Sequence, residues 1–275
     1  MSEPRLTLQH VQLADAALAV VDEGAGEPIV FLHGFPLDHS MWRHQAEFLA
    51  SRYRVIVPDL RGFGQSDGVR EVLTMEACAD DVAQLLERLD ITQPVTLVGL
   101  SMGGYVAFQF WRRYPQKLRR LVLCDTRSVA DAPEVARGRL QMAERVLQEG
   151  SQVIAEGMIG RLLYESLPPQ HRLLVDELRA VIERADPRAV AAAQRGMAVR
   201  PDVTAWLSEI RVPTLVLCGE RDVISPREEM QALAAAIPAS HWAAIPAAGH
   251  LPSLEQPAAV NQALLAFLLA TRESL

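Results

Sequence analysis

The sequence has few cysteines and lacks any clustered pattern of metal ligands. Its 275 residues include only Cys78, Cys124 and Cys218. An odd number of cysteines, two of them at the ends of apolar runs, is typical of buried thiols in a reducing compartment rather than of a disulfide framework. No Cys-x-x-Cys pair and no group of His and Cys with metal-ligand spacing occurs. We therefore expect no bound metal.

Long basic runs and apolar runs of membrane-spanning length are also missing. The formal net charge is -7, which argues against nucleic acid or an anionic membrane surface as a main partner. A membrane helix needs about 20 apolar residues, and no run comes near that length. Residues 1–5 lack the basic segment before an apolar stretch that marks a signal peptide. The expectation is a cytoplasmic protein that does not insert into membranes.

Apolar strand-like runs alternate regularly with helical patterns. Because 49% of the residues are hydrophobic and 22% are charged, the chain can bury a substantial core. The alternation predicts an α/β fold with repeated βαβ units and a mainly parallel sheet, in which ligands bind beyond the carboxyl ends of the strands. The expected strands cover 6–13 and 17–21 (a hairpin), 29–32, 53–57, 95–98, 121–123, 214–217 and 242–245, and the expected helices cover 41–50 (with Ser40 as N-cap), 74–89, 105–111 and 258–269.

One long segment breaks this alternation. Between residues 127 and 210 all the patterns are helical, at 133–149, 152–163, 170–185 and 188–197, and no apolar strand run interrupts them. We interpret this segment as an inserted helical cap, or lid, at 127–210. The core would then comprise 1–126 and 211–275.

A Gly-x-Ser-x-Gly pattern stands where a strand-like run gives way to a helix. Ser101 is its central residue, and Gly99 and Gly103 flank it. A turn this sharp forces the central residue toward positive φ, and the glycines remove the Cβ atoms that would collide. The hydroxyl is then exposed at the start of a helix, as a nucleophile requires. The alternative is a glycine-rich turn with an incidental serine.

A serine nucleophile needs a base, and the base needs a carboxylate that fixes its tautomer. His250 follows the last expected strand and is the best-placed base. Two acids compete for the third role, because Asp125 and Asp222 each follow a strand. The order Ser, Asp, His favours Asp222, and its loop leads into a helix for which Ser225 is the expected N-cap. Asp125 is then expected to be a hydrogen-bonding residue in the floor of the site.

Acyl transfer also needs N–H donors that stabilise an oxyanion. The backbone N–H of Met102, directly after the nucleophile, is one candidate. The second is the N–H of Phe35, in the loop after the strand at 29–32. We expect His33 to brace that loop.

Together these motifs resemble the α/β-hydrolase superfamily. The resemblance rests on the segments at 33–36, 59–66, 99–104, 219–222 and 249–250, which occur in the family's order and span nearly the whole chain. It implies an eight-stranded sheet flanked by helices, a helical cap after the sixth strand, and hydrolysis through an acyl-enzyme. Within the superfamily the chain resembles small esterases and lactonases, such as 3-oxoadipate enol-lactonases and acyl-homoserine-lactone hydrolases, and also cofactor-free haloperoxidases or perhydrolases. Dehalogenases and epoxide hydrolases of this fold carry Asp at the position of Ser101.

The sequence thus predicts a serine hydrolase of carboxylic esters or lactones that uses no metal or organic cofactor. A perhydrolase or C–C bond hydrolase with the same triad is the alternative enzyme, and a small-molecule receptor is the non-enzymatic one. Arg127 and Arg195 could contact a substrate carboxylate, although a surface position is the simpler interpretation for each. Candidates for the pocket wall, some of which could simply pack helices, are Phe35, Met102, Trp111, Met142, Met158, Leu162, Leu163, Met197 and Leu251.

Overall fold

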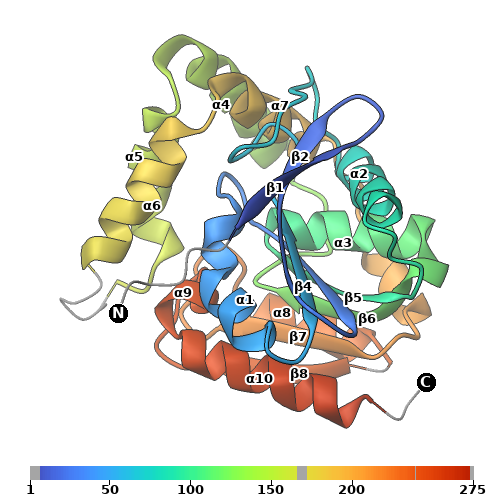
Figure 1. The fold of residues 1–275 in the computed structure, drawn as a ribbon. Helices are drawn as coiled ribbons and strands as arrows, with labels where there is room; N and C mark the ends of the chain where they lie inside the picture. The colour runs from blue at the N-terminus through green and yellow to red at the C-terminus, as the bar shows by residue number, and fades with distance from the viewer. Residues whose placement is uncertain (1–6, 166–171, 239, 273–275) are drawn as a thin grey trace.

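One eight-stranded sheet organises the part of the chain described by the computed structural model, residues 7–165, 172–238 and 240–272. The order across the sheet is β1-β2-β4-β3-β5-β6-β7-β8, and Figure 1 shows its twist. The strands are β1 Leu8–Gln12, β2 Ala17–Gly24, β3 Pro28–Leu32, β4 Arg54–Pro58, β5 Val95–Leu100, β6 Leu118–Cys124, β7 Thr214–Gly219 and β8 Ser240–Ile245.

The sheet is antiparallel at one edge and parallel elsewhere. β1 and β2 form the expected hairpin, and β2 pairs antiparallel with β4. All neighbours from β4 across to β8 are parallel. Every residue of β3 and β5 is buried, which explains why these strands are continuous apolar runs without alternation. The predicted α/β-hydrolase fold is confirmed.

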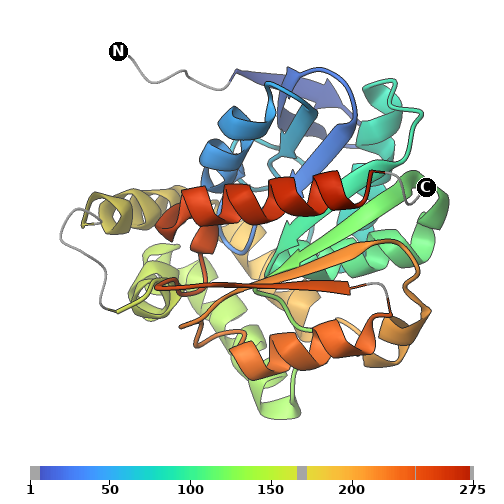
Figure 2. The ribbon, with the colours of Figure 1, turned by 90° about the horizontal axis from the view of Figure 1, so that it is seen from below.

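Helices cover both faces of this sheet. α1 packs against α10, α2 packs against α3, and α8 packs on β7 and β8. Figure 2 shows α8 and α10 on opposite sides of β8. None of the helices in the described part combines the length and apolarity needed to cross a bilayer. The bounds are α1 Arg43–Leu49, α2 Met75–Arg88, α3 Met102–Arg113, α8 Arg227–Ala236, α9 Pro252–Glu255 and α10 Pro257–Ala270, with the short 3₁₀ turns η1 His39–Trp42 and η2 Pro115–Lys117.

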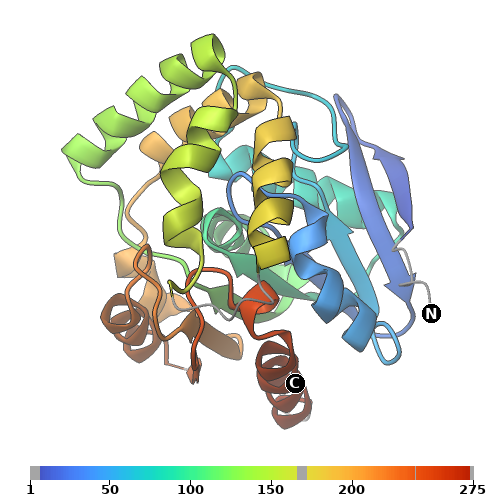
Figure 3. The same ribbon diagram turned by 90° about the vertical axis from the view of Figure 1, so that its left-hand side faces the viewer.

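A helical insert separates β6 from β7, and Figure 3 shows its helices grouped together on one side of the molecule. α4 packs on α7, and α5 packs on α6. No strand occurs between β6 and β7 among the described residues, as the sequence predicts. Residues 170 and 171, the expected start of the third helix, lie outside the described residues. The elements are α4 Pro133–Glu149, α5 Gln152–Leu162, α6 Arg172–Arg184, α7 Pro187–Ala198 and the 3₁₀ helix η4 Thr204–Glu209.

The expected start of the first helix is wrong by a few residues. The 3₁₀ turn η1 comes first, and its N-cap is Asp38, not Ser40. The Asp38 carboxylate accepts the N–H of Ser40 at 3.0 Å, because Asp caps a helical start as well as Ser does and stands one residue before the turn. The expected burial of all three cysteines is confirmed.

Candidate active site

Ser101 lies on the sharp turn between β5 and α3. Its backbone has φ 53 and ψ -112, the positive-φ conformation that non-glycine residues rarely adopt. A Cβ at Gly99 would lie 2.3 Å from the carbonyl oxygen of Gly103, and one at Gly103 would lie 2.4 Å from that of Leu32. Both positions therefore require glycine, and the glycines of the pattern have the steric role that the sequence predicts.

Two backbone N–H groups beside Ser101 are free to donate hydrogen bonds to an anionic oxygen. Within the described residues, neither the N–H of Met102 nor that of Phe35 donates to another group. Met102 is the first residue of α3, so its N–H points out of the helix N-terminus. The Phe35 loop lies close to the serine, because a Cβ built on Gly34 would be 3.5 Å from the Cβ of Ser101.

The buried side chain of His33 supports the Phe35 loop. It is fully buried, its Nε2 accepts the N–H of Leu60 at 2.9 Å, and its Nδ1 lies 3.0 Å from the carbonyl oxygen of Gly34. These partners place the proton on Nδ1. Burial lowers the pKa of His33, so the ring is neutral and serves as a fixed support. The expectation that His33 braces the loop is consistent with these contacts.

Asp59 holds the start of η1, which follows the Phe35 loop in the chain. One oxygen of its carboxylate accepts both the backbone N–H and the Nδ1–H of His39, at 2.7 and 2.8 Å. The other accepts the N–H of Gln65 at 2.9 Å. Asp38, His39 and Asp59 lie close enough together to be considered as metal ligands. Both Asp59 oxygens, however, already accept hydrogen bonds from N–H groups. The segment at 59–66 thus holds the site's loops in place.

His250 and Asp222 form a buried hydrogen-bonded pair. Nδ1 of His250 lies 2.8 Å from Oδ2 of Asp222, and the two side chains are 3% and 0% exposed. The other Asp222 oxygen accepts the N–H of Ile224 at 2.7 Å. The bond between His250 and Asp222 joins the loops after β7 and β8, and the two residues are 28 positions apart. It leaves Nε2 as the imidazole nitrogen available to a second partner.

Asp125 lies beside this pair but has a different partner. Its Oδ1 accepts the N–H of Gly219 at 2.8 Å, and polar atoms of Asp125, Asp222 and His250 lie within 4.8 Å of one another. Burial and then the negative charge of Asp222 raise the pKa of Asp125 well above its usual range. This shift favours the neutral form of Asp125, whereas Asp222 is the acid that contacts His250.

The expected N-cap role of Ser225 is wrong. α8 has Pro226 as its N-cap residue and no side-chain cap. The Ser225 hydroxyl donates instead to the backbone carbonyl of Asp125 at 3.0 Å. A buried carbonyl at a strand end needs a donor, so Ser225 ties the loop that carries Asp222 to the end of β6.

The backbone of Ser101 is hydrogen-bonded to the end of β6, next to the group formed by Asp125, Asp222 and His250. Its N–H donates to the carbonyl of Cys124 at 3.0 Å, and its own carbonyl accepts the hydroxyl of Thr126 at 2.8 Å. Asp125 stands between these two partners in the sequence, and one of its carboxyl oxygens lies within 4.8 Å of a ring nitrogen of His250. Within the described residues, no hydrogen bond joins the hydroxyl of Ser101 to His250.

The predicted pocket residues fall into three groups. Leu162 and Leu251 lie beside His250, because the carbonyl of Leu162 accepts the N–H of His250 at 3.0 Å. Trp111 lies about 15 Å from Ser101 along α3, given a rise of 1.5 Å per residue, and its indole contacts the guanidinium of Arg112. It is not among the residues that line the cavity between the insert and the core. Leu163 also lies near His250, because a Cβ at Gly249 would be 2.8 Å from its carbonyl carbon. Met197 belongs to the hydrophobic core, and Met142 and Met158 pack against that core.

A cavity of about 350 Å³ separates the insert from the core. The residues that line it are not among those predicted from the sequence, although Leu37 follows Phe35 by two residues and Leu254 follows His250 by four. Its charged rim residues are paired across the gap, Arg43 with Glu177 and Arg184 with Asp38. The apolar lining consists of Leu37, Met41, Leu174, Leu178, Ala180, Val181 and Leu254.

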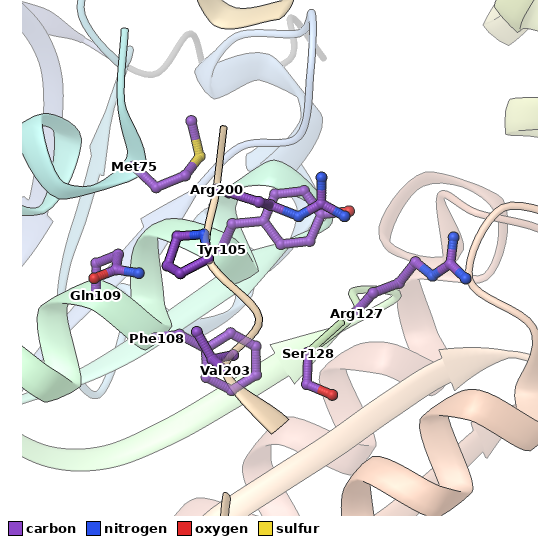
Figure 4. A pocket seen from close by; sticks show the side chains of 9 residues that line it. Met75, Tyr105, Phe108, Gln109, Arg127, Ser128, Arg200 and Val203 are labelled. Carbon is purple, nitrogen blue, oxygen red and sulfur yellow. The ribbon is translucent and has the colours of Figure 1, made fainter. Parts of the chain in front are cut away.

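The other cationic candidates are engaged elsewhere. Arg127 pairs with Glu229 and Arg195 pairs with Glu144, each through surface carboxylates, so both have the surface position that was the simpler expectation. Figure 4 shows a second, much smaller cavity, of about 10 Å³, where the insert joins the core. There the guanidinium of Arg200 lies 4.3 Å from the centre of the Tyr105 ring, and the space suits one water molecule, not a substrate.

Comparisons with known proteins agree with this architecture. Residues 27–257 match the family model described as the alpha/beta hydrolase fold. A thermophilic esterase from Thermogutta terrifontis has 48% identity and a TM-score of 0.93, covering 96% of this chain and 98% of the esterase. The enol-lactonase from Burkholderia xenovorans LB400 has 25% identity and a TM-score of 0.88, covering 95% and 100%. The AB hydrolase superfamily protein YisY of Bacillus subtilis is 30% identical, covering 95% and 97%.

Proposed function

The chain belongs to the α/β-hydrolase family, and from that premise we propose that it cleaves carboxylic esters or lactones through an acyl-enzyme formed on Ser101. The observation that carries the assignment is the buried bond between His250 and Asp222, at 2.8 Å, beside a strained serine turn with two free amides. The similar esterase and enol-lactonase support the same type of reaction.

In the proposed mechanism, Nε2 of His250 removes the hydroxyl proton of Ser101 as its oxygen attacks the ester carbonyl. The carbonyl oxygen becomes an oxyanion and accepts the N–H groups of Phe35 and Met102, each worth about 3 kcal/mol in the transition state. The imidazolium then protonates the leaving alcohol. Water, deprotonated by the same imidazole, attacks the acyl-enzyme and releases the acid and the free serine.

Asp222 holds His250 in the tautomer that these reaction steps require. Its Oδ2 accepts a hydrogen bond from Nδ1–H, so Nε2 carries a lone pair that can take up the serine proton. When His250 takes up the serine proton, the adjacent carboxylate stabilises the positive charge. The missing bond between Ser101 and His250 does not oppose this role, because catalytic hydrogen bonds are often long until substrate binds.

The apolar cavity supports an uncharged substrate. Its volume of about 350 Å³ lies within the range of small-molecule sites, and both arginines on its rim are already paired with carboxylates. We therefore favour neutral esters over lactones that carry a carboxylate. We also propose that residues 127–210 act as the cap that closes this cavity over the core.

Chemical labelling tests the assignment. We expect a fluorophosphonate to label the wild-type protein at Ser101 alone. We expect Ser101→Ala to fold normally, to resist labelling and to lose at least about a thousandfold in kcat on an activated ester. A variant that keeps near-native turnover would exclude Ser101 as the nucleophile. The reaction is then identified with a panel of substrates: short and long acyl esters, homoserine lactones, enol-lactones and substrates for C–C cleavage. Peracid formation is measured in a separate assay.

A further inference from the structure

Glu255 is a buried carboxylate that the mechanism above does not use. It is 2% exposed, and its two oxygens accept three backbone N–H groups. Oε1 accepts those of Gly249 and Leu251, at 2.9 and 3.2 Å, and Oε2 accepts that of Tyr164 at 2.7 Å. Gly249 and Leu251 are the sequence neighbours of His250. One oxygen therefore holds both ends of the loop that carries the imidazole.

The third donor belongs to the insert. Tyr164 comes two residues after the end of α5, and the carbonyl of Leu162, the last residue of α5, accepts the N–H of His250 at 3.0 Å. A Cβ at Gly249 would lie 2.7 Å from the Tyr164 nitrogen and 2.8 Å from the carbonyl carbon of Leu163. The backbone of the insert thus lies directly against the His250 loop, and only glycine allows this approach.

This arrangement needs two acceptor oxygens, which a carboxyl group supplies. Among the described residues no side-chain cation pairs with Glu255, so the three N–H groups are the donors that balance its charge. They oppose the burial that raises the pKa of this carboxyl. A glutamine has the same shape but only one acceptor oxygen, so either Tyr164 or the His250 loop would face an NH₂ group instead.

We propose that Glu255 is a positioning residue that fixes the His250 loop and couples it to the end of α5. The proposal rests on the function proposed above, because it assumes that His250 moves the serine proton. In this arrangement the segment from Leu162 to Tyr164 is a fixed wall of the site. A displacement of that segment would shift the imidazole relative to Ser101.

The first test is Glu255→Gln, with Glu229→Gln as the control at a surface glutamate. Each rate is divided by the concentration of sites that the fluorophosphonate titrates, so a loss of folded protein does not count. We expect Glu255→Gln to lower kcat per site about ten- to a hundredfold, as a misplacement near 1 Å does, while KM changes less than about threefold. The control should retain wild-type kcat and KM. An unchanged kcat per site in Glu255→Gln would overturn the proposal.

The second test removes the donor on the insert and leaves Glu255 intact. Tyr164→Pro has no backbone N–H, and the extended backbone of Leu163 (φ -116, ψ 154) suits a following proline. Tyr164→Ala is the matched variant, because it loses the side chain and keeps the N–H. We expect kcat per site to be at least about fivefold lower in the proline variant than in the alanine variant, from the loss of one charge-assisted hydrogen bond. Equal values would overturn the coupling to α5.

Combining Glu255→Gln with Tyr164→Pro separates one shared contact from two independent effects. If both changes break the same bond, the loss in the double variant is smaller than the product of the single losses. A product of the two losses would overturn the shared role. Failure of the proposed function has a different signature, since the wild-type protein would then not be labelled at Ser101.

Discussion

At the scale of single residues, three buried carboxyl groups surround His250, and their partners distinguish them. Asp222 accepts the imidazole Nδ1–H, Asp125 accepts the N–H of Gly219, and Glu255 accepts three backbone N–H groups. Asp222 thus contacts the imidazole, Asp125 has a raised pKa that favours its neutral form, and Glu255 holds the His250 loop. This division leads to different expectations for substitutions at each position.

Asp222→Asn should cost far more activity than Asp125→Asn. Asparagine at 222 would hold the imidazole in the wrong tautomer, and we expect a loss on the order of ten-thousandfold in kcat/KM. Asparagine at 125 can still accept the N–H of Gly219, so the expected loss is about tenfold or less. Both variants are purified and compared on one ester. A larger loss at Asp125 would transfer the orienting role to it.

The raised pKa of Asp125 also predicts how stability depends on pH. Its pKa is raised well above the usual range by burial and by Asp222, so the folded chain keeps a proton that the unfolded chain releases above about pH 3.9. The contribution of this group to the free energy of unfolding therefore falls as pH rises, until pH passes the folded-state pKa. Asparagine does not titrate and removes that fall.

We therefore expect Asp125→Asn to gain stability relative to the wild type as pH rises, by up to about 1.4 kcal/mol per pH unit. Urea unfolding of both proteins between about pH 5 and pH 8 measures the difference. Parallel curves across this range would contradict a protonated Asp125. Glu229→Gln, at a surface ion pair, is the control for the loss of an ordinary carboxyl group.

At the scale of elements, Arg120 connects β6 to the end of α10. Its side chain is 1% exposed. Its guanidinium pairs with Glu27 and donates to the hydroxyl and the carbonyl of Thr271, at 2.6 and 3.1 Å. Arg119 also approaches Glu27, at 3.6 Å, but is 28% exposed. Arg120 and Arg119 therefore allow the contributions of a buried and a partly exposed arginine to stability to be compared, since both lie beside Glu27.

We expect Arg120→Ala to lower the free energy of unfolding by about 3 kcal/mol, because it leaves buried partners unpaired. We expect Arg119→Ala to lower it by less than about 1 kcal/mol, as for a surface pair. Urea unfolding at neutral pH measures both changes. Similar losses in the two variants would mean that Arg120 contributes no more than a surface charge does.

The elements were more predictable than the contacts between them. β3 and β5 are continuous apolar runs, and the serine turn needs its glycines, so short stretches of sequence are enough to predict them. By contrast, the partners of Ser225 and Glu255 come from other loops, at Asp125 and Tyr164. A capping pattern at Ser225 and an ordinary acid at Glu255 are all that local sequence indicates. Which donor each group finds depends on packing between distant segments.

At the scale of the whole molecule, the proposed substrate cavity is lined by residues of both the insert and the core, so the packing of one against the other sets its shape. One wall comes from the loop after β3, from η1 and the start of α1, and from α9, and the other comes from α6. Two ion pairs cross between the walls, Arg43 with Glu177 at 3.0 Å and Arg184 with Asp38 at 3.1 Å. The size of the cavity therefore depends on side chains that the helix α6 presents to the core.

Leu178 provides a test of this cavity. It is 3% exposed on α6 and lines the cavity, whereas Leu173 on the same helix is 72% exposed. Leu178→Trp should fill part of the space and reduce kcat/KM for long acyl esters at least about tenfold, since each methylene excluded from an apolar pocket costs about 1–3 kcal/mol. Short acyl esters should change less than about threefold by the same reasoning, and Leu173→Trp should match the wild type on both. Equal losses of Leu178→Trp on short and long esters would show that the tryptophan disturbs the reaction centre and that the cavity does not hold the acyl chain.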